Sequence, residues 1–125
     1  MDSLLFDIDG TLIHTRGAGR AALASGFEQA FGIRDEKEIE TSGRTDRAIV
    51  LDLFAAHGVD DCEENWGRMA AAYAEHLPGH LAQRKGCVLP GVAELLSHLG
   101  SRENTLVGLL TGNSTDGARL KLEHF

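Results

Sequence analysis

The chain has 125 residues, of which 42% are hydrophobic and 25% charged, so it is long enough for one modest globular domain. Its net charge of −7 argues against nucleic acid as a partner, because phosphate-backbone binding requires clustered lysine and arginine. No transmembrane helix is expected, because no run of about 18 apolar residues occurs. Asp2 is atypical of a signal peptide, and Cys62 and Cys87 suggest no disulfide framework. We therefore expect a cytoplasmic protein that contacts no membrane.

The first half of the chain combines one apolar strand with helical patterns. Residues 3–8 are almost continuously apolar and predict a buried strand. Apolar residues recur at helical spacing over residues 18–31 and again over residues 45–57, and a glycine follows each of the two segments. The charged stretch 33–44 lies between them and predicts a loop or a short irregular helix.

A third helix is expected to begin after Asp61. Glu64 stands three residues further on, in the register of a capping box, and an apolar stripe that includes Trp66 and Tyr73 follows. The Pro78-Gly79 pair is expected to end this helix, because proline disrupts a helix interior. The two aromatic residues are predicted to be core residues.

The last third of the chain predicts a helix, a strand and another helix. Pro90 is well placed as the first residue of a helix that stops at Gly100. Residues 105–110 predict a second buried strand, and a final helix begins near Ser114. The helical stretch between the two strands is far longer than the dozen or so residues that a simple crossover needs. The order therefore predicts an α/β core over residues 1–14 and 86–125, with an inserted helical domain over residues 15–85.

Both predicted strands end in polar motifs. The first continues as Phe6-Asp7-Ile8-Asp9-Gly10-Thr11-Leu12, and the second as Leu109-Leu110-Thr111-Gly112-Asn113. With these motifs in this order, the chain resembles the haloacid dehalogenase-like (HAD) phosphohydrolase superfamily, and most closely its phosphoglycolate-phosphatase-like members with a helical cap. The resemblance implies an α/β fold with a parallel-sheet, Rossmann-like core and an inserted all-helical cap.

Phosphoryl transfer requires a nucleophile, a proton shuttle and cations that hold the charge of the phosphoryl oxygens. Asp7 is the candidate nucleophile, which would form an aspartyl-phosphate, and Asp9 is the candidate general acid and base. Mg²⁺ would relieve the repulsion between the two carboxylates, and the resemblance assigns a carboxylate oxygen of Asp7 and the main-chain carbonyl of Asp9 to that ion. Gly10 and Thr11 are expected beside the phosphate.

The second motif and two basic side chains complete the expected site. Thr111 would bind a phosphoryl oxygen, and Gly112 and Asn113 would offer main-chain N–H groups, although the same turn could simply begin a helix. Lys121 resembles the family lysine that bridges nucleophile and phosphate; the alternative is a solvated helix lysine. Arg44 would reach down from the cap to the substrate, or else it is solvated.

The resemblance also implies an acidic motif after a third core strand, and the sequence ends at Phe125 without one. Two parallel strands with open edges form a marginal sheet, so we expect an oligomer or a missing C-terminal half to cover them. The chain is thus expected to be an incomplete, weakly active or inactive part of a phosphatase.

The expected substrate is a small phosphorylated metabolite, such as phosphoglycolate or a sugar phosphate. A phosphomutase or a dehalogenase of the same fold is an alternative, although Asp9 argues against a dehalogenase, which protonates no leaving oxygen. The remaining alternative is a non-catalytic fragment that binds a partner through its open sheet edge.

Overall fold

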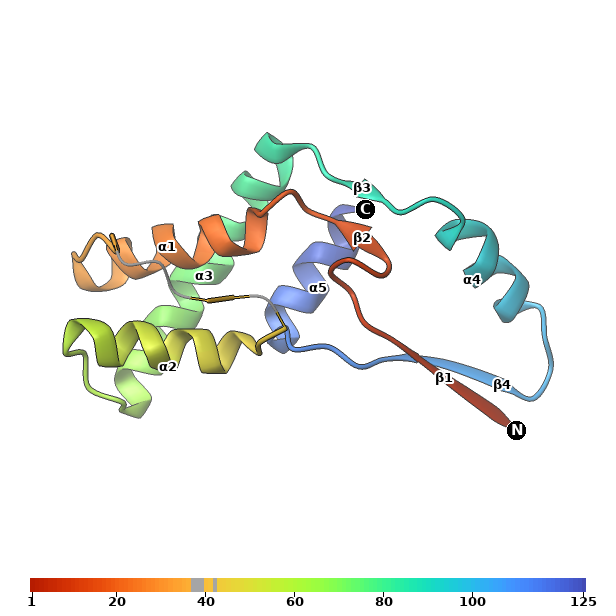
Figure 1. Cartoon of the computed structure of the whole chain (residues 1–125), viewed down its shortest axis with the longest axis horizontal. Helices are drawn as coiled ribbons and strands as arrows, with labels where there is room; N and C mark the ends of the chain where they lie inside the picture. The colour runs from red at the N-terminus through yellow and green to blue at the C-terminus, as the bar shows by residue number, and fades with distance from the viewer. Residues whose placement is uncertain (37–39, 42) are drawn as a thin grey trace.

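The computed structural model describes residues 1–36, 40–41 and 43–125 and has two regions joined by a central helix (Figure 1). We call α1, α2 and α3 the helical region; they are α1 (Ala18–Phe31), α2 (Asp46–His57) and α3 (Glu63–Arg84). We call β1, β4 and α4 the strand region; they are β1 (Asp2–Phe6), β4 (Thr105–Leu109) and α4 (Val92–Gly100). Helix α5 (Thr115–His124) lies between the regions and packs against α3. No helix in the described ranges is both long enough and apolar enough to span a membrane.

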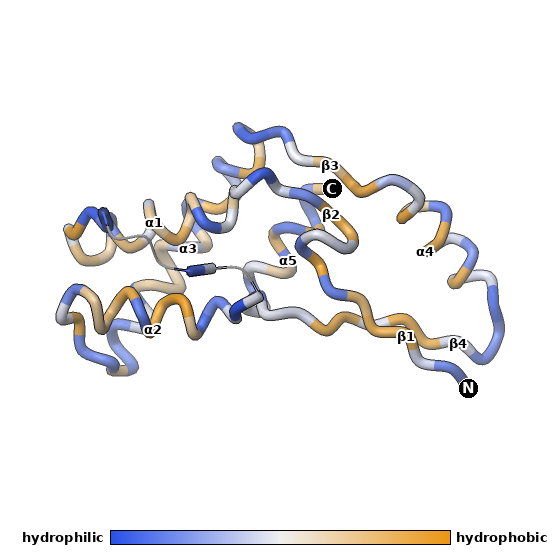
Figure 2. The backbone as a smooth tube through the Cα atoms, viewed as in Figure 1, coloured by the Kyte–Doolittle hydropathy of each residue, from blue (hydrophilic) through white to orange (hydrophobic). Residues whose placement is uncertain are grey.

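The two long strands pair in parallel, as expected for an α/β fold. Leu4 lies opposite Val107, and Phe6 lies opposite Leu109. The expectation that both strands are buried is wrong, because Leu5 of β1 is 62% exposed and Leu106 of β4 is 56% exposed. A strand is buried only where further layers cover it, and within the described residues this sheet has two strands, with α4 packed against β4. The apolar stretch is visible along β1 and β4 in Figure 2.

A short antiparallel pair that the sequence analysis missed joins the two crossings between the regions. Strands β2 (Ile13–His14) and β3 (Cys87–Val88) each have two residues. A Cβ at Gly86 would collide with the His14 carbonyl oxygen, so glycine permits this close approach. The left-handed residues Arg16 and Lys85 flank the pair, and the Arg84 guanidinium donates to the Arg16 carbonyl oxygen at 3.0 Å. The two crossings therefore lie side by side. The division of the chain at residues 14–15 and 85–86 stays a prediction.

Helices α1 and α2 have the expected extents, for the expected reasons. Gly32 and Gly58 follow them in the left-handed conformation, with φ of 67° and 68°, and cap the C-terminal ends. The Thr45 side chain accepts a hydrogen bond from the Ala48 N–H and caps the start of α2. The expected loop or irregular helix over residues 33–44 lies partly outside the described residues.

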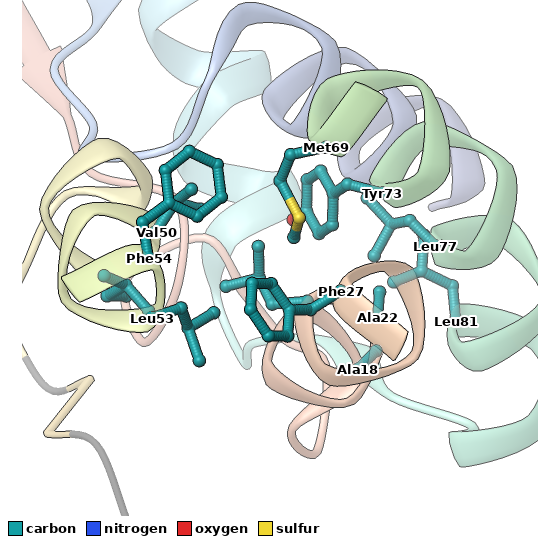
Figure 3. Packing of buried hydrophobic residues seen from close by; sticks show 12 residues of the cluster. Ala18, Ala22, Phe27, Val50, Leu53, Phe54, Met69, Tyr73, Leu77 and Leu81 are labelled. Carbon is teal, nitrogen blue, oxygen red and sulfur yellow. The ribbon is translucent and has the colours of Figure 1, made fainter. Parts of the chain in front are cut away.

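The helical region has a hydrophobic core of its own (Figure 3). Phe27 of α1 is fully buried and lies within ring-contact distance of Phe31 and Phe54. Helix α3 contributes Met69, Tyr73, Leu77 and Leu81 to the same cluster. The predicted stripe of α3 is therefore core, and Tyr73 is buried as expected.

Helix α3 departs from the sequence-based expectation at both ends. It continues through Pro78 to Arg84, so the expected break is wrong. Leu77 and Leu81 are buried on either side of the proline, and their packing outweighs the roughly 3 kcal/mol that an interior proline costs. The capping box is also wrong, because the Asp61 carboxylate accepts a hydrogen bond from the Trp66 indole N–H at 2.6 Å instead.

Helix α4 begins later than expected, and α5 begins as expected. Gly91 precedes the first turn of α4, so Pro90 stands two residues before the helix rather than opening it. Gly100 is the last residue of α4, followed by the cap Ser101. The Ser114 side chain accepts from the Gly117 N–H and caps α5. Just before this cap, the Leu110 N–H donates to the Phe6 carbonyl oxygen at 2.9 Å, at the end of β1.

Candidate active site

Ile8 separates the two acidic residues of the first motif. Its side chain is fully buried in a small cluster with Leu12 and Ile13. Asp7 and Asp9 stand on either side of Ile8 in the chain, and neither belongs to this cluster. Both line a cavity of about 720 Å³ at the end of β1. The first motif thus delivers two carboxylates to one cavity.

The loop after Asp9 is closed by backbone hydrogen bonds. The Ile8 carbonyl oxygen accepts from the N–H groups of Leu12 and Ile13 at 2.9 and 3.2 Å. Gly10 has a φ of +79° and lines the cavity, which fits its expected place beside a phosphate. Thr11 is absent from the described cavity wall, so its expected place beside the phosphate is not reproduced.

Asp7 has the less engaged carboxylate of the two. Within the described residues, its carboxylate makes one hydrogen bond, accepting from the adjacent Ile8 N–H at 2.8 Å. The side chain is exposed to the cavity, and its second oxygen is free to approach a ligand. This is the arrangement that an attacking carboxylate needs.

The second motif faces Asp9 from the other side of the cavity. The Thr111 hydroxyl accepts from the Asn113 N–H at 3.1 Å and from the Asn113 side-chain amide at 2.8 Å. The same amide donates to the Asp9 carboxylate at 2.8 Å. Two motifs about a hundred residues apart in the sequence are thus joined by hydrogen bonds.

Lys121 is buried at the base of this network, with 4% of its surface exposed. Its ammonium group donates to both Asp9 carboxylate oxygens, at 2.9 and 3.1 Å, and to the Asn113 side-chain oxygen at 2.6 Å. The alternative of a solvated lysine is therefore wrong. Among the described residues, its carboxylate partner is Asp9 rather than the expected Asp7.

Arg44 lines the cavity, but its guanidinium is bound within the helical region. It donates to the Asp52 carboxylate at 2.6 Å and to the carbonyl oxygens of Glu40 and Ala48 at 3.0 and 3.3 Å. The structure therefore shows a partly exposed Arg44 whose guanidinium is bound to Asp52 rather than to either of the two aspartates. Arg16 and Arg20 also line the cavity.

Asp46 belongs to the stretch Gly43-Arg44-Thr45-Asp46, for which the sequence predicts either a substrate contact from the cap or a helix start. The Asp46 N–H donates to the Gly112 carbonyl oxygen at 2.8 Å, and the Asp46 carboxylate accepts from the Ser114 N–H at 2.9 Å. Burial raises the pKa of the Asp46 carboxyl, although the Ser114 bond and Lys121 act in the opposite direction. Asp46 could be predicted as a helix-start residue, but its contact across the cavity could not.

Tyr73, which was predicted only as a core residue, has its phenol where the helical region meets α5. A Cβ at Gly117 of α5 would stand 3.2 Å from the Tyr73 hydroxyl, and a Cβ at Gly19 of α1 would stand 3.6 Å from it. In the described part of the chain, this buried hydroxyl has no hydrogen-bond partner. Burial, followed by the carboxylates of Asp46 and Asp9, raises the pKa of the phenol.

This geometry can be set against known proteins. The family described as Haloacid dehalogenase-like hydrolase matches residues 4–125, which is nearly the whole chain. The chain belongs to the haloacid dehalogenase-like hydrolases. A comparison with proteins of curated function found no match.

Two solved structures show the same fold as this hydrolase-family chain. A hydrolase from Pseudomonas syringae is 24% identical, with a TM-score of 0.69. CbbY from Rhodobacter sphaeroides, in complex with phosphate, is 18% identical, with a TM-score of 0.71. Each match covers 99% of this chain and 56% of the other, so the chain spans little more than half of their length. The resemblance to the HAD superfamily and the α/β fold are thereby confirmed.

The oxygen donors of this hydrolase-family site can be tested against Mg²⁺. In the described ranges, no group of three or more acidic, histidine or cysteine side chains could hold a metal. Asp7 and Asp9 supply two carboxylates at one cavity. Mg²⁺ is commonly held by one or two carboxylates, with waters and substrate phosphate oxygens as the other ligands. The donor set fits that kind of site, and Asp7 is its more available member because Asp9 is paired with Lys121.

Proposed function

We propose that the protein is a Mg²⁺-dependent phosphomonoester hydrolase that works through an aspartyl-phosphate on Asp7. The observation that carries the proposal is the meeting of Asp7, Asp9, Thr111, Asn113 and Lys121 at one cavity. These residues supply a nucleophile, a proton carrier, neutral donors and a cation, which are the groups that phosphoryl transfer needs. The complex of CbbY with phosphate supports a phosphorylated ligand, because CbbY shares this fold.

In the proposed first step, an Asp7 carboxylate oxygen attacks phosphorus, and the bond from phosphorus to the leaving oxygen breaks. Asp9 gives its proton to that oxygen, so the product leaves as a neutral alcohol. Bound Mg²⁺ would offset the negative charge of the phosphoryl oxygens, and the Asp7 carboxylate and the Asp9 main-chain carbonyl are the groups that would hold it.

In the second step, water attacks the phosphorus of the aspartyl-phosphate, and Asp9 takes the proton of that water. Inorganic phosphate leaves, and the Asp7 carboxylate is restored. This cycle requires Asp9 to carry a proton, and in the structure the Asp9 carboxylate is paired with the Lys121 ammonium group at 2.9 Å. A substrate phosphate competes for the Lys121 ammonium group, so phosphate binding would release Asp9 from that pair.

The experiment is Asp7→Asn, measured as hydrolysis of p-nitrophenyl phosphate with Mg²⁺ in a longer protein that carries these residues. We expect activity to fall to the background rate, because an amide cannot form the phosphoryl bond. Asp2→Asn, at the other end of β1, is the matched control and is expected to retain activity. Full activity of Asp7→Asn would refute the mechanism. For the 125-residue chain alone we expect little or no turnover, and robust turnover would refute that.

The substrate class is a small phosphomonoester, phosphoglycolate or a sugar phosphate, as the resemblance implies. A cavity of about 720 Å³ is of the size that small-molecule sites commonly have. A panel of phosphomonoesters tested on the longer protein would identify the substrate. A cytoplasmic location is proposed with this function and is tested by cell fractionation.

One observation favours a second candidate function, a non-catalytic role through the uncovered sheet. Leu5, Leu106 and Leu110 are all more than half exposed. An oligomer or a C-terminal half of the core would cover these residues, and a partner protein could do the same. Asp7→Asn separates the two functions, because it should abolish hydrolysis and leave partner binding unchanged.

A further inference from the structure

The helical region contacts the turn between β4 and α5 through a reciprocal pair of hydrogen bonds. The Asp46 N–H donates to the Gly112 carbonyl oxygen at 2.8 Å, and the Ser114 N–H donates to the Asp46 carboxylate at 2.9 Å. Asp46 therefore holds the turn at two places, one on each side of Asn113. We call residues 111–114 the 111–114 turn.

The backbones also approach closely at this contact. A Cβ at Gly112 would stand 3.1 Å from both the Arg44 carbonyl oxygen and the Thr45 Cα. Real Cβ atoms seldom come so near to backbone atoms, so a larger residue at position 112 would push the turn away from the start of α2. Two hydrogen bonds and the close approach at Gly112 therefore hold the start of α2 against the 111–114 turn.

This contact fixes the position of Asn113, which hydrogen-bonds to several other residues of the site. Asn113 lies between the two backbone groups that Asp46 holds, and its side chain contacts Thr111, Asp9 and Lys121. A change in the backbone of the 111–114 turn would therefore disturb the contacts of Asn113 with three residues of the proposed catalytic network. Asp46 makes none of these contacts itself and acts through the turn.

We propose that Asp46 is a positioning residue, which holds the 111–114 turn in its phosphate-binding conformation from the helical side of the cavity. The turn then has its binding geometry only while the start of α2 is seated against it. The phosphate part of this proposal rests on the proposed function, whereas the positioning of the turn does not.

Three variants separate the hydrogen bond from the charge. Asp46→Asn removes the negative charge and keeps a side-chain oxygen that can accept from the Ser114 N–H. Asp46→Ala removes the same charge and the acceptor as well. Asp116→Ala is the matched control, because Asp116 is an exposed acid in the first turn of α5 whose described ion pair is a 3.6 Å contact with Arg119.

The first measurement is hydrogen exchange of the Ser114 amide in the 125-residue chain, followed by NMR. We expect Asp46→Ala to speed exchange about tenfold, which corresponds to the loss of one ordinary hydrogen bond. Asp46→Asn is expected to stay within about threefold of the parent chain. Asp116→Ala should leave the rate unchanged. Equal exchange in the parent chain and Asp46→Ala would overturn the proposal, as would equal acceleration by Asp46→Ala and Asp116→Ala.

The second measurement is the affinity for inorganic phosphate, determined by titration of the same variants. Asp46→Asn should bind phosphate at least as tightly as the parent chain, because a negative charge beside the anion is lost. Asp46→Ala has the same charge and should bind several-fold more weakly than Asp46→Asn. Equal affinities in these two variants would overturn the positioning role. Absence of phosphate binding in every chain would count against the proposed function, and the exchange rates would still decide the positioning of the turn.

Discussion

The helical region and the strand region are built from similarly apolar segments but bury them very differently. Phe27 of the helical region is fully buried, whereas Leu5 of the strand region is 62% exposed. Three helices can enclose a core among themselves, because each presents one apolar stripe to the other two. A pair of strands has two faces and two edges, and α4 packs against β4 and against the small cluster around Ile8. The helical region is therefore expected to supply most of the stability of the chain.

The sharpest test of this contrast compares one large residue from each region. Phe27→Ala should lower the free energy of unfolding by about 3–5 kcal/mol, because it opens a cavity in the helical core. Leu5→Ala should change it by less than about 0.5 kcal/mol, because the leucine already contacts solvent. Urea unfolding followed by circular dichroism measures both. Similar losses in the two variants would show that the strand region has a core of its own.

A smaller loss of stability is expected when the close contact between α1 and α3 in the helical region is disturbed. Gly26→Ala should cost about 1–3 kcal/mol, because its Cβ would stand 3.0 Å from the Tyr73 backbone nitrogen. Gly67→Ala is the matched change at an open position of α3 and should stabilise by up to about 1 kcal/mol. Thermal or urea unfolding distinguishes the two. A neutral Gly26→Ala would mean that α1 and α3 can move apart without cost.

The contact between the helical region and α5 is tested by Tyr73→Phe. In the described part of the chain, the hydroxyl is buried without a partner, so its removal should leave the free energy of unfolding within about 0.5 kcal/mol or raise it. Tyr73 is the sole tyrosine of the chain, so its absorbance can be followed without interference from another phenol. A loss of more than about 1 kcal/mol would indicate that the hydroxyl has a partner in solution.

The smallest expected effect is a pH dependence at Asp46. Burial raises the pKa of this carboxyl above its ordinary value of 3.8, so the folded chain binds the proton more tightly than the unfolded chain. The contribution of Asp46 to stability is therefore lost as pH rises from about 3.8 through the folded pKa. The stability gained by Asp46→Asn should grow over this range and then level off, as measured by urea unfolding between pH 3 and 7. Asp116→Asn, on the exposed side of α5, should show no such trend.

Local chemistry made the helix ends and the first motif predictable. Gly32 and Gly58 ended helices because each takes a left-handed conformation that other residues avoid. Asp7 and Asp9 could be predicted as a pair acting at one site because they stand two residues apart directly after an apolar segment. These features depend on a few neighbouring residues, which a sequence displays directly.

The features that were missed depend on contacts between distant segments. Pro78 lies inside α3 because the leucines around it are buried against the helical core. Arg44 is bound by Asp52, and Asp46 contacts the 111–114 turn, although neither contact has a sequence pattern. The strands β1 and β4 have apolar sequences, and their exposure reflects the layers around them rather than their own residues. Tertiary context decides each of these cases.

The pairing of β2 with β3 has a mechanical consequence. The chain crosses between the regions twice at this place, and the two crossings are tied to each other by ladder hydrogen bonds and by the Arg84 contact with Arg16. Two independent connections would let the helices rotate and slide in several directions over the cavity, whereas a paired connection would act as a single hinge. The start of α2 would then swing along one arc, toward the 111–114 turn or away from it.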